Sequence, residues 1–363
     1  MLPIILTSAA VIGGIALALG LILALADKFL ADYGVVTLTI NGDKELSVKG
    51  GNSLLYTLFQ QKYFIPSACG GKGTCAYCKL VVTEGAGPYL PTEKIVLTDE
   101  EMAKNVRLSC QVKVRGAMRV EIPAEYFEIG EYEAVLEKAE LVTPAIKELT
   151  FRLADPPAIK FKAGQYVQIQ APAPGTGEAV YRAYSMASLP SLRETVSFNV
   201  RLEENGVAST YLFGLKDGDP VKFSGPYGEF LYSRSGRNAV CLATGVGLAP
   251  FRSLIPDILE SDPDVEVFLF FGARVKGDLY GGADIEEWAK NPKFHYIPIL
   301  SGEEGDWDGE RGRMDVVFFA KFFESHAQDE YYLCGAPVVV NSLTAELIKR
   351  GVPEGRIHFD KFG

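Results

Sequence analysis

The first 26 residues form an uncharged, mostly apolar run that ends before Asp27 and Lys28. At a rise of about 1.5 Å per residue, a helix of this length crosses a hydrocarbon layer of about 30 Å, so residues 1–26 predict one transmembrane helix. A signal peptide is the alternative, because Ala24-Leu25-Ala26 resembles a cleavage site, but no basic side chain precedes the run. Lys28 favours a cytoplasmic location for the remaining chain, and hence a single-pass protein of the cell inner (plasma) membrane.

The next hydrophobic pattern predicts a small domain over residues 34–127. Strands at residues 35–40 and 45–48 flank the turn Asn41-Gly42, which is typical of a β-hairpin, and a helix is expected over residues 54–61. From about Glu131 short strands alternate with turn signals, which is typical of a barrel or sandwich. We expect these strands at residues 132–141, 146–153, 166–170, 183–187, 196–202 and 220–223.

The last third of the chain alternates strands with helices. Strands are expected at residues 238–244, 265–271, 294–300 and 331–334, and helices at 250–261, 283–290 and 338–350. This order predicts parallel βαβ units, which bind ligands at the carboxyl ends of their strands. The fold class is therefore multidomain: an N-terminal transmembrane helix (1–26), an α+β domain (34–127), an antiparallel β-barrel (130–233) and an α/β domain with a parallel sheet (237–363).

Charge and composition exclude several classes of protein. The chain of 363 residues is 48% hydrophobic and 23% charged, as in globular proteins. With 36 Lys and Arg against 46 Asp and Glu the net charge is −10, so we expect no nucleic-acid partner. Six cysteines are too few for a disulfide framework, and four of them, Cys69, Cys75, Cys78 and Cys110, indicate a metal site.

Those four cysteines have the spacing C-x5-C-x2-C with a distant fourth. Three thiolates so close in sequence wrap a small cluster if the backbone curls tightly, and Gly70, Gly71 and Gly73 permit the φ values that such a curl needs. Structural zinc is the alternative, but its usual second short cysteine or histidine pair is absent from the sequence. We therefore expect a 2Fe-2S cluster held by all four cysteines, although the plant-type spacing is one residue shorter, C-x4-C-x2-C.

A second motif lies in the expected barrel. Along one strand Arg182, Tyr184 and Ser185 alternate so that the first two share a face and Ser185 takes the other. This R-x-Y-S pattern resembles the ferredoxin-NADP reductase-like superfamily. The resemblance implies that Arg182 pairs with a flavin phosphate, that Tyr184 packs on the isoalloxazine ring, and that Ser185 hydrogen-bonds near its N5 atom. It also implies FAD as the cofactor, with its pyrophosphate at a helix opened by Gly206, Ser209 and Thr210.

A glycine turn follows the first strand of the α/β part. Gly245, Gly247 and Pro250 form G-x-G-x-x-P, which lets a dinucleotide approach the backbone, although a plain tight turn has the same pattern. This turn predicts the binding of a nicotinamide dinucleotide.

Two further likenesses to the superfamily lie near the C-terminus. The segment Cys334-Gly335-Ala336-Pro337 resembles its C-G-x-P motif, which implies that Gly335 and Pro337 bind near the nicotinamide and that Cys334 shapes catalysis. Relatives place a terminal aromatic over the flavin, and Phe362 is the candidate here. Arg274 and Lys276 lie where a 2′-phosphate would bind, so the residues leave NADH and NADPH both open.

The order of anchor, 2Fe-2S domain, FAD barrel and NAD domain resembles a family of NADH-oxidising subunits, the F subunits of the Na⁺-translocating NADH:quinone oxidoreductases. The resemblance implies a β-grasp ferredoxin fold for the first domain and a hydride transfer from NADH to FAD. Single electrons would then pass through the cluster to other membrane subunits of a quinone-reducing, ion-translocating complex. One uncharged helix cannot itself form an ion pathway. The alternatives are a reductase for a soluble oxygenase or corrinoid protein, and a tethered ferredoxin whose reductase half is degenerate.

Overall fold

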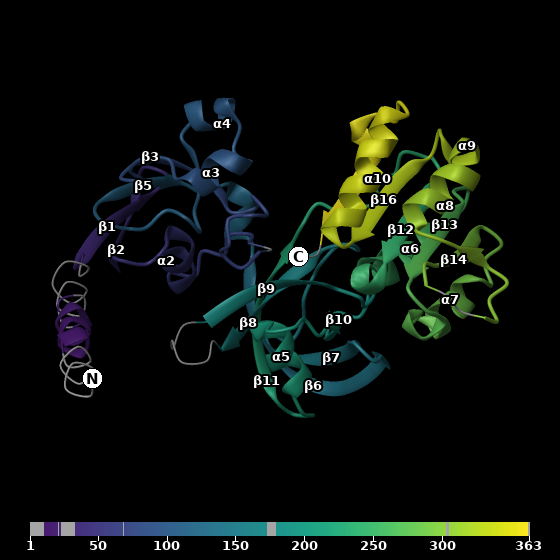
Figure 1. Cartoon of the computed structure of the whole chain (residues 1–363), viewed down its shortest axis with the longest axis horizontal. Coiled ribbons are helices and arrows are strands. Elements are labelled where there is room, and N and C mark those ends of the chain that lie inside the picture. Colours follow the sequence, from purple (N-terminus) through teal and green to yellow (C-terminus); the bar gives the residue numbers. More distant parts are fainter. Residues whose placement is uncertain are drawn as a thin grey trace, which may run out of the picture. The chain divides into compact units, whose positions relative to one another are not determined.

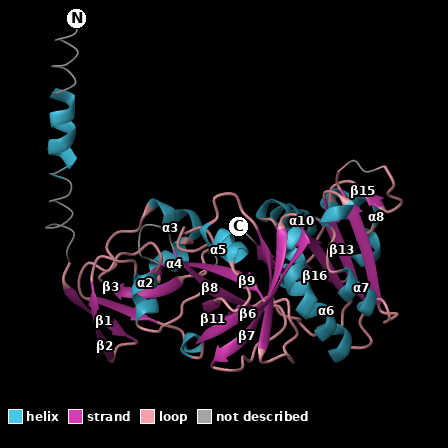
Figure 2. Ribbon diagram, turned by 90° about the horizontal axis from the view of Figure 1, so that it is seen from below, coloured by secondary structure: helices cyan, strands magenta, loops and turns pink. Residues whose placement is uncertain are grey.

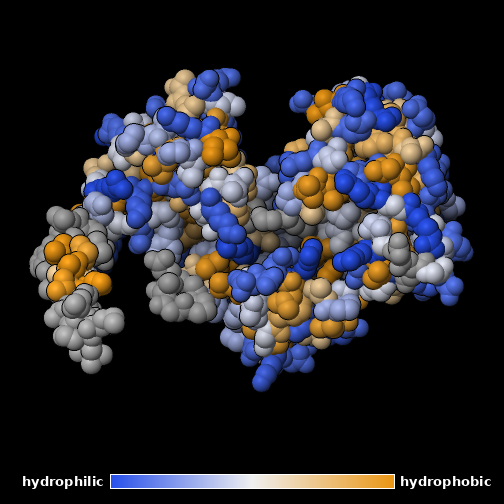
Figure 3. All heavy atoms as spheres, viewed as in Figure 1, coloured by the Kyte–Doolittle hydropathy of each residue, from blue (hydrophilic) through white to orange (hydrophobic). Residues whose placement is uncertain are grey.

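The structure, a computed structural model, describes residues 11–20, 22, 33–67, 69–172, 179–302 and 305–361. Residue contacts divide the chain into two compact units, Met1–Ile65 with Gly71–Glu128 and Pro66–Gly70 with Ile129–Gly363. Residues 11–20 are helical and expose apolar side chains (Figure 3). Across the described ranges, no helix is long and apolar enough to cross a bilayer. The other residues of the predicted membrane segment, except residue 22, lie outside the described residues.

The first unit is a mixed β-sheet with helix α2 packed against it (Figure 1). The sheet order is β2-β1-β5-β3-β4, in which β1 and β5 are parallel and the other pairs are antiparallel. Its elements are β1 (Val35–Ile40), β2 (Lys44–Lys49), α2 (Leu54–Gln60), β3 (Lys79–Glu84), α3 (Pro91–Val96), α4 (Asp99–Ala103), β4 (Val106–Leu108), β5 (Met118–Glu121) and the 3₁₀ turn η1 (Ala124–Phe127).

Local chemistry explains the start of this unit. The predicted hairpin is present, and Asn41 and Gly42 both take the positive φ that a tight turn between two strands requires. The Asn41 side chain also exchanges two hydrogen bonds with the backbone of Ile122, which ties the turn to the end of β5. Ser53 caps α2 by accepting a hydrogen bond from the backbone N–H of Tyr56, so the helix begins where the sequence pattern predicts.

The first half of the second unit is an antiparallel sheet in the order β10-β7-β6-β11-β8-β9. A bridge between Met186 and Phe198 joins the segments at the two edges, which closes the sheet into the predicted barrel. Strand β11 runs past its predicted end at residue 223 to Tyr227, and its register against β8 shifts between Ser224 and Tyr227. The elements are β6 (Gly130–Thr143), β7 (Ile146–Asp155), β8 (Tyr166–Pro172), β9 (Ala179–Ser185), β10 (Thr195–Arg201), α5 (Val207–Gly214) and β11 (Pro220–Tyr227).

The second half of this unit is a parallel sheet in the order β15-β14-β13-β12-β16-β17 (Figure 2). Its elements are β12 (Ala239–Thr244), η2 (Gly245–Leu248), α6 (Ala249–Ser261), β13 (Val267–Ala273), η3 (Lys276–Asp278), α7 (Gly282–Trp288), β14 (Phe294–Leu300), β15 (Glu310–Arg311), α8 (Met314–Lys321), α9 (Phe323–His326), β16 (Glu330–Gly335), α10 (Pro337–Lys349), η4 (Glu354–Arg356) and β17 (Ile357–Lys361).

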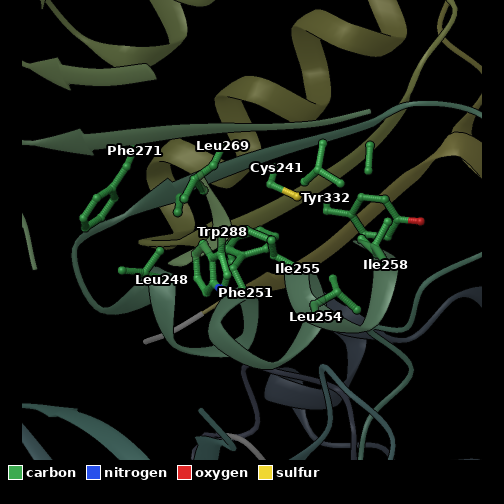
Figure 4. Close-up of a cluster of buried hydrophobic side chains, with 14 of the residues drawn as sticks. Cys241, Leu248, Phe251, Leu254, Ile255, Ile258, Leu269, Phe271, Trp288 and Tyr332 are labelled. Atoms are coloured by element: carbon green, nitrogen blue, oxygen red, sulfur yellow. The ribbon is translucent and has the colours of Figure 1, made fainter. Parts of the chain in front are cut away.

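Both faces of the parallel sheet are buried by helices. On one face Phe251 and Ile255 of α6 pack with Cys241 and Leu269 of the central strands, as Figure 4 shows. Helices α8 and α10 cover the other face. Because β12 connects to β13 on one side and pairs with β16 on the other, the strand order reverses at β12, and the carboxyl end of this strand is the expected ligand crevice.

A partly buried arginine joins the barrel to the parallel sheet. Arg252 of α6 donates to Glu148 of β7 at 2.6 Å and to Asn199 of β10 at 3.3 Å, and a third bond reaches Asp284 of α7 at 2.5 Å. Its side chain is only 14% exposed. Arg252 thereby holds the strand ends of the two halves in one arrangement.

Candidate functional site

Strand register brings two of the predicted cluster ligands together. Lys79 of β3 pairs with Leu108 of β4 in an antiparallel ladder, so Cys78, which precedes β3, lies beside the residues that follow β4. The backbone N–H of Ser109 donates to the carbonyl of Cys78 at 2.9 Å. The thiols of Cys78 and Cys110 are hydrogen-bonded, and this bond together with burial raises the pKa of Cys78 far above its ordinary value.

Cys75 lies close enough for its charge to act on Cys78, and it is partly exposed whereas Cys78 and Cys110 are buried. Cys69 is also buried, and it belongs to the second unit, whereas the other three cysteines belong to the first. Within the described ranges, no group of three His, Cys, Asp or Glu side chains surrounds a single metal position. A two-iron cluster does not need such a group, because each iron takes two protein thiolates. Neighbouring thiols such as Cys78 and Cys110 fit this requirement.

A buried ion pair supports the strand that leads to Cys110. Arg107 of β4 and Glu93 of α3 are 3% and 0% exposed, and they form two parallel bonds of 2.9 and 2.7 Å. Burial acts to raise the pKa of Glu93, but hydrogen bonds from Arg107 and from the backbone N–H groups of Leu90 and Leu108 outweigh it and lower this pKa. The pair therefore anchors α3 to β4, whose last residue lies two positions before Cys110.

In the barrel, strand β9 presents the three residues of the predicted flavin motif. Tyr184 packs against the barrel core, and burial raises its pKa. Ser185 is buried, and its hydroxyl donates a hydrogen bond to Asp360 of β17. Arg182 is partly exposed and donates to the carbonyl of Tyr181 at 2.8 Å. The expected division of the motif between two faces of the strand is thus present for Tyr184 and Ser185.

Helix α5 begins beside this strand at the second predicted flavin segment. Gly206 is its N-cap, and a Cβ atom there would overlap the Ser209 hydroxyl. Ser209 donates to the carbonyl of Gly206 and accepts from the N–H of Glu203, so its hydroxyl shapes the loop. Thr210 is exposed and donates its backbone N–H to Gly206. The first turn of a helix leaves backbone N–H groups without partners inside the helix, which fits the pyrophosphate of FAD.

Two glycine turns meet at the carboxyl ends of β12 and β16. Gly247 lies so close to the turn after β16 that a Cβ atom would overlap the backbone of Cys334, and a Cβ atom on Gly335 would overlap the Thr244 hydroxyl. Gly335 also has φ +148, which side chains disfavour. Each turn then starts a helix with a proline in its first turn, Pro250 in α6 and Pro337 in α10, while Gly245 has φ +52. A glycine-containing turn at this switch point fits a dinucleotide.

Asp360 connects the flavin motif to the nicotinamide motif. It lies in β17 opposite Cys334 of β16, and its carboxylate accepts a hydrogen bond from the Ser185 hydroxyl at 3.3 Å. Burial raises the pKa of Asp360 to about 6, against partial opposition from its hydrogen bonds with Ser185 and Lys361. Burial, and then the charge of Asp360, raise the pKa of Cys334 well above its ordinary value, so this cysteine is a thiol and not a thiolate at neutral pH.

Sequence patterns did not indicate Asp360, Glu93 or Arg252. The one sequence signal for Asp360 is an acidic residue within a C-terminal strand pattern. This signal does not indicate its partner Ser185, which lies 175 residues away. Phe362, the terminal aromatic that the resemblance indicated instead, lies outside the described residues. Cys241 is fully buried in the core of the parallel sheet.

Comparisons with known proteins match all three parts of the chain. A 2Fe-2S iron-sulfur cluster binding domain matches residues 38–115, an oxidoreductase FAD-binding domain matches residues 133–232, and an oxidoreductase NAD-binding domain matches residues 241–344. The F subunit of the Na⁺-translocating NADH-quinone reductase of Pseudomonas aeruginosa is 34% identical over 392 aligned positions, which cover 96% of each chain. The F subunit of Neisseria meningitidis is 33% identical, covering 96% of this chain and 97% of that protein.

The chain belongs to the family of Na⁺-translocating NADH-quinone reductase F subunits. Solved structures of other reductases share the fold of this chain. A cytochrome P450 reductase from Amycolatopsis has a TM-score of 0.72 and 27% identity, covering 90% of this chain and 98% of that one. The ferredoxin reductase of carbazole 1,9a-dioxygenase has a TM-score of 0.70 and 27% identity, covering 91% and 99%. The chain therefore carries a 2Fe-2S domain, an FAD-binding domain and an NAD-binding domain in that order.

Proposed function

We propose that this protein is the electron-input subunit of a membrane-bound NADH:quinone reductase. It oxidises NADH and passes the electrons one at a time to another membrane subunit of an ion-translocating complex. The observation that carries the proposal is the junction of Ser185, Asp360 and Cys334, which brings the flavin motif and the nicotinamide motif together. Family membership at 34% identity over nearly the whole chain supports the same function.

When bound, FAD takes two electrons from NADH and releases them singly, and the 2Fe-2S cluster carries one electron at a time. The residues of the chain bind and orient these groups. Arg182 and the N-terminus of α5 would hold the flavin phosphates, Tyr184 would pack on its ring, and the turns at Gly247 and Gly335 would hold the nicotinamide dinucleotide. We propose Cys69, Cys75, Cys78 and Cys110 as the cluster ligands and Phe362 as the aromatic over the flavin.

Asp360 supplies a proton-exchanging group beside the junction. A carboxyl group whose pKa is about 6 gains and loses a proton close to neutral pH. Among the described residues, Ser185 is the one whose side chain donates a hydrogen bond to this carboxylate. We infer that the Asp360 carboxyl group and the Ser185 hydroxyl hold an exchangeable proton beside the flavin motif. The uncharged Cys334 thiol would fill the space beside the nicotinamide.

The membrane part of the proposal rests on the sequence. Residues 1–26 carry no charge and are long enough for one span, and Lys28 favours a cytoplasmic location for the catalytic domains, at the inner membrane. A second candidate function is a reductase for a soluble oxygenase, because the P450 reductase and the dioxygenase reductase share the fold at 27% identity.

An anaerobic reduction experiment tests the proposed function. The full chain, loaded with FAD, iron and sulfide, is mixed with NADH or NADPH, and flavin absorbance and the electron paramagnetic resonance (EPR) signal of the reduced cluster are followed. We expect NADH to bleach the flavin before the cluster signal rises. Asp360→Asn and Ser185→Ala should slow the bleaching, whereas Ser188→Ala should not, because that buried hydroxyl accepts a hydrogen bond from the backbone N–H of Ser197. A chain whose bound flavin neither nucleotide reduces would refute the proposal.

The acceptor is tested with membranes that hold the other subunits of such a complex but lack the F subunit. Added full chain should restore quinone reduction by NADH. If the chain instead reduces only soluble oxygenase components, the second candidate function is correct.

A further inference from the structure

The side chain of Gln111 bridges three parts of the cluster region. Its Nε2 atom donates to the carbonyl of Gly71 at 2.8 Å and to the sulfur of Cys110 at 3.5 Å, while its Oε1 atom accepts from the hydroxyl of Thr92 at 3.1 Å. All of these residues lie in the first unit. One amide therefore contacts the cysteine loop, a proposed ligand sulfur and helix α3.

We propose that Gln111 is a positioning residue that raises the reduction potential of the 2Fe-2S cluster and braces the cysteine loop around it. The inference rests on the proposed function, because it takes Cys110 as a cluster ligand. Gln111 lies outside the cysteine set, and its effect is on the cluster and not on the flavin or nicotinamide sites.

The contacts determine which end of the amide faces the sulfur. A backbone carbonyl such as that of Gly71 can only accept, so the amide NH₂ group must lie on that side. The other end of the amide is then the carbonyl oxygen, which accepts from Thr92. The NH₂ group has two N–H donors, which serve the carbonyl of Gly71 and the sulfur of Cys110.

The cysteine loop is packed against this amide. Gly73 has φ +77, and a Cβ atom there would lie 3.0 Å from Cδ of Gln111, so a side chain at position 73 would crowd the amide. The backbone of Gln111 is itself fixed, because its N–H donates to the carbonyl of Leu108 at 2.8 Å. The partly buried amide thus links the end of β4 to the loop between Cys69 and Cys75.

Electrostatics gives the direction of the effect. An N–H dipole aimed at a ligand sulfur stabilises negative charge, and the reduced cluster carries one more negative charge than the oxidised cluster. The bond from Gln111 therefore stabilises the reduced form more strongly and raises the potential. Without this bond the cluster is a weaker acceptor for electrons from the flavin.

The test is a redox titration of the cluster in the full chain with chemical reductant and mediators, followed by EPR. Gln111→Leu removes both donors at similar size, and we expect its midpoint potential to shift to more negative values and its cluster to be lost faster under an iron chelator. Thr92→Val leaves the donors but removes the hydroxyl that orients them, so a smaller shift of the same sign is expected. The control Gln60→Leu changes an exposed glutamine of α2 and should leave the potential unchanged.

Equal midpoint potentials in the wild type, Gln111→Leu and Thr92→Val would overturn this proposal alone, since the titration uses no NADH. If Gln111→Leu does not retain a cluster, Thr92→Val alone decides the direction of the shift. A wild-type chain that takes up no cluster from iron and sulfide would overturn the proposed function together with the role of Gln111.

Discussion

Replacing Arg252 by methionine should weaken the junction between the two halves of the flavin and nicotinamide unit. Arg252 is 14% exposed, and its partners Glu148 and Asp284 are 25% and 33% exposed. Removing one member of a fully buried pair costs about 3 to 5 kcal/mol, and water that reaches these carboxylates reduces this to about 2 to 3 kcal/mol. The remaining carboxylates would also repel each other across the junction between α6, α7 and β7.

Urea unfolding of the FAD-loaded full chain, followed by the rise of flavin fluorescence on release, measures this cost. With an m value of about 2 to 3 kcal/mol per M, the midpoint should fall by about 1 M urea. The same loss of alignment should lower kcat/KM for NADH by about tenfold, because small misplacements of reacting groups have large effects on rate.

A matched surface pair is the control for this prediction. Arg152 of β7 pairs with Glu137 at 2.9 Å, but both side chains are more than 40% exposed, so Arg152→Met should cost less than about 1 kcal/mol. The triple variant Arg252→Met, Glu148→Gln, Asp284→Asn should recover most of the lost stability, because no uncompensated charge remains. If Arg252→Met unfolds at the same urea concentration as Arg152→Met, the interpretation of Arg252 as a clamp is wrong.

Three other residues, Asp360, Gly247 and Glu93, each give a further prediction. Burial raises the pKa of Asp360 from 3.8 to about 6, so the ionised carboxylate lowers the free energy of unfolding by about 3 kcal/mol above pH 6. Asp360→Asn should therefore stabilise the flavin-free chain by up to this amount at pH 8. Below pH 4, urea unfolding should show no gain in stability. Gly247→Ala should lower kcat/KM for NADH by about 10- to 100-fold with unchanged flavin content, whereas Gly277→Ala, whose Cβ meets nothing within 4 Å, should match the wild type. Glu93→Gln should destabilise the first unit by about 3 kcal/mol or more at pH 7, because it leaves Arg107 buried without a counter-charge. Since the pKa of Glu93 is lowered in the fold, this stabilisation is present above the ordinary carboxyl pKa and is lost as the pH falls through the lowered value, so the two unfolding midpoints should converge in acid.

The order of the parts and the motifs proposed for each group could be read from the amino-acid sequence alone. The hairpin at Asn41-Gly42, the short strands of the barrel and the alternating strands and helices of the last third could be predicted, because each is a local pattern of hydrophobic period and turn residues. The spacing of Cys75 and Cys78 and the glycine turn at Gly247 could be read in the same way, since their members are close in the chain.

Which distant residues meet depends on the tertiary fold. Ser185 and Asp360 lie 175 residues apart, and the bond from Arg252 to Glu148 spans 104 residues. Such pairs leave no periodic trace in the sequence, because each depends on the register of several strands and on the packing of one half of the unit against the other. The raised pKa of Asp360 has the same origin, since a carboxyl group is desolvated only when β17 is paired and covered.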